Sequence, residues 1–254
     1  MQVTGIKIRG IEFGKGMPKL CVPIVGHTEK EILTQAQDIM RNQPDCVELR
    51  IDWFQDVSNV QKVLHMLADL RPVIGDTVLL FTFRSEQEGG RRSITCEDYK
   101  ALCTAACTSG YIDLLDVEAF MQEGLLASIC EIAHRNGVYV VGSNHDFEKT
   151  PDEEDIVSRL KYMDEQGADI PKIAVMPQKE RDVLTLLSAT LTYHETGGIK
   201  PIITMSMDDI GMVSRLAGEI FGSALTFATV GRASAPGQIP IDEARQSLRV
   251  LHRQ

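Results

Sequence analysis

Hydrophobic and polar positions follow two repeating patterns along this chain of 254 residues. Short runs rich in Val, Ile and Leu, apolar at nearly every position, are separated by longer stretches with helical periodicity. Continuous apolar runs of this length are typical of strands in a parallel sheet that is covered on both faces. We therefore predict strands at residues 19–26, 46–52, 77–84, 111–118, 138–143, 170–176, 201–206 and 225–230.

A predicted helix follows each of these strands. The first begins with a Thr-x-x-Glu capping box at Thr28, the fifth has Pro151 at its first helical position, and Pro240 opens the last. We expect the second helix over residues 58–70 and a single helix between the seventh strand and Phe221. Eight alternating units in about 230 residues are the signature of a (β/α)8 barrel, or TIM barrel.

Ahead of the first unit, two short alternating runs flank Arg9–Gly10 and predict a small N-terminal β-hairpin. A doubly wound open sheet is the main alternative fold, but it would need a glycine-rich first turn, and Gly26–His27–Thr28 is not one. The sequence contains no linker and no low-complexity segment. We therefore expect one α/β domain over residues 1–254, with the hairpin in residues 1–17 and the barrel in residues 18–254.

Composition and charge narrow the class of partner. With 43% hydrophobic residues the chain can bury a large core, and its formal net charge of -10, without a long basic run, argues against nucleic acid or anionic membranes as partners. No apolar run approaches the length of a membrane span, and the first residues lack the basic-then-apolar layout of a signal peptide. We therefore expect a cytoplasmic protein.

The six cysteines do not form the pattern of a metal site. None belongs to a C-x-x-C pair, and Cys96, Cys103 and Cys107, which share one helical face, have no histidine or acid beside them at ligand spacing. We expect the cysteines to be small buried apolar residues, and we predict that the protein holds no metal ion.

Ionisable side chains stand at the C-terminal ends of nearly all the predicted strands, where the active sites of such barrels lie. Taken singly, most of them have a structural explanation, such as an ion pair, a helix cap or a solvated helix face. Together they place an inward lysine, a histidine, several acids and three arginines at one end of one barrel. The main ones are Glu48, Arg50, Asp52, Arg84, Glu88, Asp116, Glu118, His145, Lys172 and Arg215.

Lys172 is the most unusual of these residues. It lies in the apolar run 170–176, where alternation places it on one face with Ala174 and Met176. Burial disfavours the charged ammonium, and an amine held partly neutral can condense with a ketone or aldehyde. A lone lysine near a strand start would more often extend to water, but the polar residues expected around it favour a catalytic role.

The combined chemistry of the set points to an imine. A histidine moves protons near neutral pH, and Glu88 could orient His145 and fix its tautomer. Arginines bind carboxylate or phosphate groups through paired hydrogen bonds. Such a site suits proton abstraction beside an iminium, followed by elimination or carbon–carbon cleavage.

Several motifs resemble those of the type I 3-dehydroquinate dehydratases, and the resemblance covers nearly the whole chain. The motifs are FTFRS at residues 81–85, EGG at 88–90, SNHDF at 143–147, ADIPKIAVMP at 168–177, ITMSM at 203–207, SRLAG at 214–218 and ASAPGQ at 233–238. The resemblance implies a (β/α)8 barrel whose N-terminal hairpin closes one end, usually in a homodimer. It also implies the third step of the shikimate pathway, in which 3-dehydroquinate loses water to give 3-dehydroshikimate without a cofactor or metal ion.

The resemblance also implies roles at the matching positions. Lys172 looks like the Schiff-base nucleophile, His145 like the general acid and base, and Glu88 like the partner that orients His145. Arg215 looks like the clamp on the substrate carboxylate. The implied contacts to substrate hydroxyls and carboxylate are Glu48, Arg50, Arg84, Ser234 and Gln238, and the implied apolar walls are Met207 and Phe227.

Two other functions remain as alternatives. A class I aldolase shares the barrel and the imine-forming lysine, but it more often binds phosphate in the loops after strands seven and eight, where this chain has Ala-Pro-Gly-Gln. A non-catalytic barrel that binds a small acid would have no use for a lysine and a histidine that face one pocket.

Overall fold

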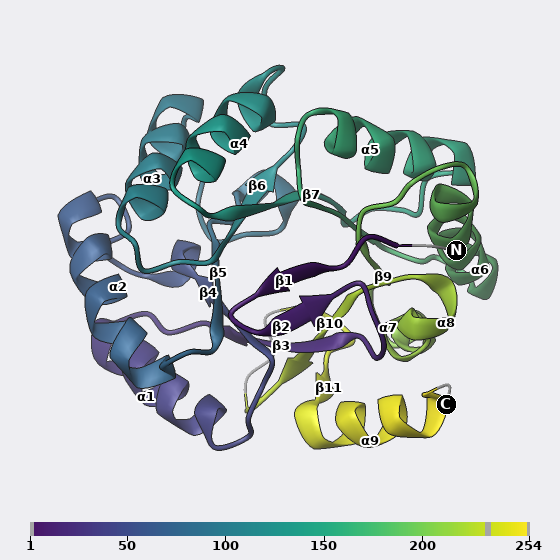
Figure 1. Cartoon of the computed structure of the whole chain (residues 1–254), viewed down its shortest axis with the longest axis horizontal. Helices are drawn as coiled ribbons and strands as arrows, with labels where there is room; N and C mark the ends of the chain where they lie inside the picture. Colours follow the sequence, from purple (N-terminus) through teal and green to yellow (C-terminus); the bar gives the residue numbers. More distant parts are fainter. Residues whose placement is uncertain (1–2, 232–234, 253–254) are drawn as a thin grey trace.

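Parallel strands curl into a barrel that is surrounded by helices (Figure 1). The computed structural model describes residues 3–231 and 235–252 of the chain. Its barrel strands are β3 (Lys19–Ile24), β4 (Cys46–Arg50), β5 (Val78–Thr82), β6 (Leu114–Glu118), β7 (Tyr139–Asp146), β8 (Ile170–Val175), β9 (Ile203–Ser206) and β10 (Leu225–Thr229). Hydrogen bonds join them in the order β10-β3-β4-β5-β6-β7-β8-β9, and the short β11 (Ile239–Pro240) pairs with β10. This order confirms the predicted (β/α)8 barrel.

Between β9 and β10 the barrel closes near the strand starts. The Ala224 N–H donates to the Ile202 carbonyl at 2.7 Å, and the Thr204 N–H donates to the Ser223 hydroxyl at 3.0 Å. The Lys19 N–H in turn donates to the Ala224 carbonyl at 2.9 Å. These bonds satisfy polar backbone groups that an open sheet edge would leave unpaired.

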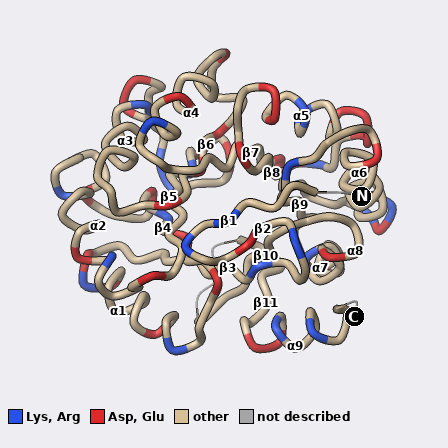
Figure 2. Tube along the Cα trace, in the orientation of Figure 1, with Lys and Arg blue, Asp and Glu red and all other residues tan. Residues whose placement is uncertain are grey.

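The outer ring consists of helices whose apolar faces cover the sheet, with acidic and basic residues interspersed around the ring (Figure 1, Figure 2). In the described part of the chain, no helix is long and apolar enough to cross a membrane. The helices are α1 (Glu29–Met40), α2 (Val60–Ile74), α3 (Cys96–Thr108), α4 (Leu125–Arg135), α5 (Glu153–Glu165), α6 (Glu180–Glu195), α7 (Met212–Leu216), α8 (Gly218–Phe221) and α9 (Ile241–Leu251), with the 3-10 turns η1 (Ile51–Trp53) and η2 (Glu86–Glu88).

Helix starts follow the side chains that cap them. Thr28 caps α1 as predicted, since its hydroxyl accepts the Glu31 N–H at 3.3 Å, although the Glu31 carboxylate returns to the His27 N–H at 2.8 Å instead of completing the predicted box. The prediction that Pro151 takes the first position of α5 is wrong. Asp152 is the N-cap, because its carboxylate accepts a backbone N–H three residues later at 2.9 Å, and Pro151 precedes the helix.

Other boundaries also differ from the predictions. α2 passes its predicted end at residue 70 and runs through Pro72 to Ile74. The single helix expected up to Phe221 is broken at Ala217 into α7 and α8. β7 extends past residue 143 to Asp146, because its residues 141–146 pair with β8. Such ends depend on tertiary pairing, which local periodicity does not report.

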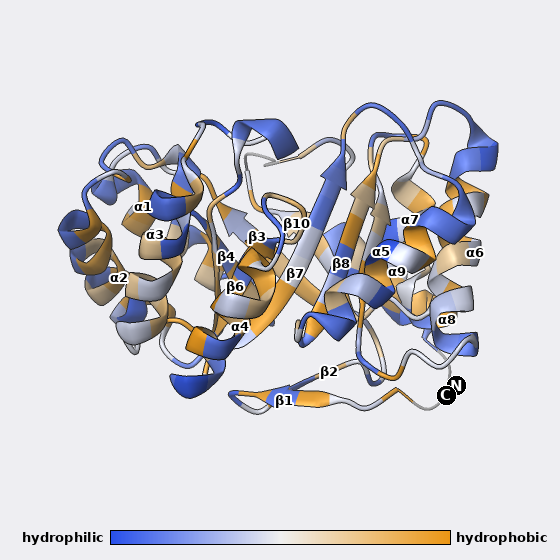
Figure 3. Cartoon of the chain, turned by 90° about the horizontal axis from the view of Figure 1, so that it is seen from above, coloured by the Kyte–Doolittle hydropathy of each residue, from blue (hydrophilic) through white to orange (hydrophobic). Residues whose placement is uncertain are grey.

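The N-terminal hairpin, β1 (Ile6–Ile8) and β2 (Ile11–Phe13), lies beneath the barrel, at the end opposite the tips of β7 and β8 (Figure 3). Phe13 is fully buried in the cluster of side chains that fills the barrel interior. Arg9, in the turn of the hairpin, donates to the Asp113 carboxylate just before β6 at 2.6 Å. The hairpin therefore closes the bottom of the barrel, as the resemblance implied.

Asp113 anchors this lower end, because its carboxylate accepts from Arg9, from Arg71 at 2.9 Å and from the Leu79 N–H at 2.9 Å. Asp113→Ala would leave the largely buried Arg71 guanidinium without a carboxylate partner and the Leu79 N–H unpaired, so we expect the free energy of unfolding to fall by about 3 kcal/mol in urea denaturation. Asp76→Ala is the matched control, since Asp76 also contacts Arg9 but is fully exposed and should not change the midpoint. Equal losses in the two variants would contradict this role of Asp113.

Candidate active site

A cavity opens at the C-terminal ends of the barrel strands and contains about 490 Å³ of empty space. A larger hollow, of about 1060 Å³, lies between the starts of α2 and α3 but holds none of the predicted site residues. The cavity is lined by every residue to which the resemblance assigns a role except Ser234, which lies outside the described residues. The lining residues are Glu48, Arg50, Arg84, Glu88, Gly89, His145, Phe147, Lys172, Ala174, Met205, Met207, Arg215, Phe227, Ala235 and Gln238.

Lys172 is held inside the barrel by β8. Its exposure is only 3%, so its amine does not extend to water as that of a lysine near a strand start often does. Its Nζ lies 3.0 Å from the Asp116 carboxylate on β6 and 4.8 Å from the centre of the Phe227 ring on β10. Ala174, two residues farther along β8, also lines the cavity. The amine therefore has both a counterion and an apolar wall.

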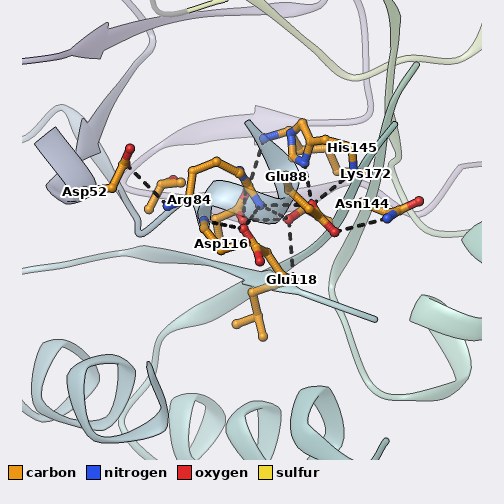
Figure 4. Close-up of polar contacts among 12 residues, drawn as sticks. Asp52, Arg84, Glu88, Asp116, Glu118, Asn144, His145 and Lys172 are labelled. Atoms are coloured by element: carbon orange, nitrogen blue, oxygen red, sulfur yellow. Dashed lines mark hydrogen bonds and ion pairs between the residues drawn. The ribbon is translucent and has the colours of Figure 1, made fainter. Parts of the chain in front are cut away.

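Asp116 is the fully buried acid that pairs with two cations (Figure 4). One carboxylate oxygen accepts from Arg84 Nη2 at 2.6 Å and from the Ser143 hydroxyl at 2.6 Å, and the other accepts from Lys172 Nζ. Burial alone would raise the pKa of Asp116, but the charges of Arg84 and Lys172 lower it to about 2. Asp116 is therefore ionised throughout the neutral pH range.

Arg84 links the strand ends on this side of the barrel. Its Nη1 donates to Glu118 at 2.9 Å, to Ser143 at 3.1 Å and, more weakly, to Glu88 at 3.4 Å. Burial opposes its charge, but the three carboxylates around it raise the pKa of Arg84 well above its usual value. With Asp116 as a fourth partner, the guanidinium is held by residues from three elements.

His145 and Glu88 form a second pair (Figure 4). Glu88 Oε2 lies 2.9 Å from His145 Nδ1 and accepts the His145 backbone N–H at 3.0 Å, while Glu88 Oε1 accepts the Asn144 amide at 3.1 Å. Burial, followed by the charges of Arg84 and Lys172, lowers the pKa of His145 well below 6.5. The imidazole is therefore neutral at pH 7, and a hydrogen on Nδ1 leaves Nε2 as a proton acceptor.

The ends of β4 and β5 carry further polar residues of the cavity rim. Glu48 on β4 accepts the Thr82 hydroxyl at 2.9 Å, and Arg50 binds Asp52 through two hydrogen bonds of 2.9 Å. The strand predicted over residues 46–52 is shorter in the structure, because β4 ends at Arg50 and Asp52 lies in the η1 turn that follows. Asp52 is fully buried in η1, where it also accepts the Arg84 N–H at 3.3 Å.

Arg215 lies across the cavity on α7 and is 2% exposed. Its Nη2 donates to the Pro236 carbonyl at 2.8 Å and its Nη1 lies 3.5 Å from the Met205 sulfur. Its Nε has no hydrogen-bond partner, and no ion pair with an acid forms among the residues that the structure describes. Burial lowers the pKa of Arg215 to about 10. A buried cation without a counterion suits an anionic ligand.

Some members of this network had no role assigned from the sequence. Asp116 and Glu118 were expected at this end of the barrel, and alternation with the buried Leu114 on β6 places them on the face that points into it. Ser143 and Asn144 belong to the SNHDF motif, but no sequence pattern specifies which partners their side chains contact.

Comparison with known proteins identifies the family of this chain. A profile of the family described as type I 3-dehydroquinase matches residues 20–254. The chain belongs to the type I 3-dehydroquinase family. It is 49% identical over 249 residues to a 3-dehydroquinate dehydratase of Listeria monocytogenes serovar 1/2a, with 98% of each chain covered. It is 47% identical over 248 residues to the 3-dehydroquinate dehydratase of Clostridioides difficile strain 630, covering 98% of this chain and 97% of that relative.

Solved structures agree with this family assignment. A 1.95 Å crystal structure of type I 3-dehydroquinate dehydratase from Clostridium difficile with covalently modified comenic acid has a TM-score of 0.95 and 47% identity, covering 99% of this chain and 98% of that one. The dehydratase of Geobacillus kaustophilus gives a TM-score of 0.95 at 40% identity, covering 98% and 96%. A Schizosaccharomyces pombe protein at 19% identity, described as dehydroquinate dehydratase and shikimate dehydrogenase, shows the shared fold alone.

Potential metal ligands lie elsewhere in this family member. Among the described residues, one group has the spacing of a metal site: Glu29 on α1 with His65 and Asp69 on α2. His65 is exposed, and none of the three lines the cavity. All six cysteines are free thiols, and all but Cys96 are buried, much as the sequence predicted.

The shifted pKa of Glu88 makes stability depend on pH. Burial raises this pKa from 4.5 to about 7, so the stability that Glu88 contributes is fully present below pH 4.5 and is lost as the pH rises through 7. Glu88→Gln removes this dependence. Between pH 5 and pH 8, we expect the wild type to lose about 2 kcal/mol of unfolding free energy relative to the variant, measured by urea denaturation. If the difference in unfolding free energy between wild type and Glu88→Gln were the same at both pH values, the raised pKa of Glu88 would be disproved.

Proposed function

We propose that the chain is a 3-dehydroquinate dehydratase that converts 3-dehydroquinate to 3-dehydroshikimate and water through a Schiff base on Lys172. The main support is the buried Lys172 amine in one cavity with a neutral His145. The Listeria and Clostridioides relatives, which are named for this reaction, support the choice of substrate. The covalently modified comenic acid in the Clostridium difficile structure supports covalent chemistry in the family.

Imine formation begins at Lys172. The amine gives up its ammonium proton to His145 Nε2, adds to the substrate ketone, and forms an iminium as water leaves the addition product. The iminium nitrogen is positive, like the ammonium that it replaces. Asp116, 3.0 Å from Nζ, therefore keeps a cationic partner and stabilises the covalent intermediate.

Elimination then uses the iminium as an electron sink. His145 Nε2 removes a proton from the carbon beside the iminium, and the electron pair of that C–H bond forms an enamine. The enamine electrons expel the hydroxyl group on the next carbon, which leaves as water when His145 returns the proton. Glu88, 2.9 Å from Nδ1, stabilises the charge that the ring carries between these transfers. Water finally hydrolyses the imine and releases the product.

Substrate binding follows from the charges on the rim. Arg215 binds the substrate carboxylate, since it is a buried cation with no acidic partner among the described residues. Ser234 keeps its implied contact as a prediction. The proposed contacts to hydroxyls are Glu48, Arg50 and Gln238, and the proposed apolar walls are Met207 and Phe227.

For Arg84 we propose a positioning role in addition to the substrate contact that the resemblance implies. It lines the cavity, but four side chains already engage its guanidinium, and they are Glu88, Asp116, Glu118 and Ser143. Arg84 thereby holds the carboxylates that face Lys172 and His145. A class I aldolase would use the same lysine, and the family assignment favours dehydration over that alternative.

Assembly and location are carried over from the resemblance. We propose a homodimer in the cytoplasm that needs no cofactor or metal ion. Large apolar side chains exposed on two neighbouring helices support self-association, and they are Met212 and Val213 on α7 and Val250 and Leu251 on α9. Light scattering of the purified protein measures the mass of the assembly.

An assay of dehydration tests the proposed function. Purified protein mixed with 3-dehydroquinate should generate the ultraviolet absorbance of a conjugated enone acid. Lys172→Ala should lose nearly all turnover, because the iminium cannot form, yet should still bind substrate through Arg215 in calorimetry. Lys100→Ala, on the exposed surface of α3, is the matched control and should keep wild-type turnover. Turnover of Lys172→Ala within tenfold of wild type would rule out the covalent route.

A further inference from the structure

A line of hydrogen bonds runs from the catalytic cavity to the outside of the barrel. Glu88 Oε1 accepts from Asn144 Nδ2 at 3.1 Å, and Asn144 Oδ1 accepts from Arg159 Nη1 at 3.0 Å. Arg159, on α5, is itself fixed by two hydrogen bonds to Asp155, of 3.0 and 2.7 Å. Asn144 directly precedes His145 on β7, so this line ends at the pair that moves protons.

The chemistry of Arg159 decides which way the Asn144 amide faces. A guanidinium has only donors, so it can contact the Asn144 carboxamide through the amide oxygen and not through the NH2 group. With the oxygen held by Arg159, the NH2 group must face Glu88. Without Arg159 the amide could turn by half a rotation and present its oxygen to Glu88 instead.

The orientation of Asn144 in turn decides where Glu88 can hold a proton. With the imidazole hydrogen on Nδ1, Glu88 Oε2 already faces three donors, namely the His145 backbone N–H, Arg84 and His145 Nδ1. Only Oε1 is left to carry a hydrogen, and there the Asn144 NH2 group stands in its way. A turned amide would offer that hydrogen an acceptor and so favour neutral Glu88.

We propose that Arg159 is a positioning residue of the active site, which locks the Asn144 amide with its NH2 group toward Glu88 and so keeps Glu88 a carboxylate beside His145. This role rests on the proposed function, because it matters for catalysis only if His145 transfers protons. A protonated Glu88 is a weaker acceptor for His145 Nδ1 and does not offset the charge that the ring gains.

Other charged groups around Glu88 and His145 affect the ionisation of this pair in either orientation of the Asn144 amide. Arg84 approaches from the loop after β5 and His145 from β7, while Lys172 and Arg50 act on the histidine from β8 and β4. Burial together with the two acids of β6, Glu118 and Asp116, raises the pKa of Glu88 to about 7. Glu88 thus titrates in a range where one hydrogen bond changes its ionisation.

The pH profile of kcat/KM in the 3-dehydroquinate assay tests the proposal. Arg159→Leu should raise the midpoint of the low-pH side of the profile, its acid limb, by roughly 0.5–1 pH unit, which is the equivalent of about one hydrogen bond. The kcat/KM should therefore fall roughly three- to tenfold at pH 6 and stay unchanged above pH 8. Arg159→Lys keeps a charge and a donor, and should restore most of the wild-type profile. Arg135→Leu, an exposed change of the same charge on α4, should leave it unmoved.

A double-mutant cycle separates the amide lock from the charge of Arg159 acting through space. Asn144→Leu removes the donor to Glu88 and should by itself raise the midpoint pH of the acid limb. In that background Arg159→Leu should add almost nothing, because there is no amide left to orient. An equal shift in both backgrounds, or an unmoved limb with lower activity at every pH, would overturn the proposal.

A measurement without substrate distinguishes this proposal from the proposed function. The ring nitrogens of His145 in ¹⁵N-labelled protein report, by nuclear magnetic resonance, the pH at which Glu88 changes its protonation. Arg159→Leu should raise that midpoint by the same amount as the kinetic limb. If wild type did not dehydrate 3-dehydroquinate but the midpoint still moved, the proposed function would fail while the lock would stand. An unchanged midpoint in Arg159→Leu would disprove the proposed role of Arg159.

Discussion

The site depends on one ion cluster, in which the buried carboxylate of Asp116 neutralises Arg84 and Lys172 at once. Two cations enclosed side by side at the end of a barrel repel each other and lose their hydration, and a carboxylate shared between them offsets both costs. The cluster also joins β6 and β8 to the loop after β5. In the proposed mechanism the same carboxylate serves before and after the covalent bond forms, because an iminium is as positive as an ammonium.

A second pair, His145 and Glu88, adjoins this cluster through Arg84. His145 is neutral because it is buried and because the nearby cations Arg84 and Lys172 oppose a further charge, while Glu88 is shared between Arg84 and the histidine. The two carboxylates therefore differ in their ionisation: the pKa of Asp116 is about 2 and that of Glu88 is about 7. Asp116 stays a constant charge, and Glu88 responds to small changes in its surroundings.

The sequence was sufficient for the architecture and for the residues that face the cavity. Continuous apolar strands alternating with helices indicate a covered parallel sheet, and strand ends bring distant residues such as Glu48 and Lys172 to one rim. It was not sufficient where a contact depends on a turn or on a partner. Asp52 lies outside its predicted strand because the η1 turn follows β4, and the contacts of Asn144 with Glu88 and Arg159 need three-dimensional proximity. The hydrophobic pattern of a sequence predicts which face of its strand a side chain occupies, whereas the partner that a side chain contacts depends on the whole fold.

The covalent bond between Lys172 and substrate is the central claim, and borohydride reduction tests it most directly. Borohydride added to the protein with 3-dehydroquinate should convert the iminium to a stable amine. Mass spectrometry of the digested protein should then show a substrate-derived mass on the peptide that contains Lys172, and no such mass without substrate. An adduct on another lysine, or turnover with no adduct at all, would contradict the account.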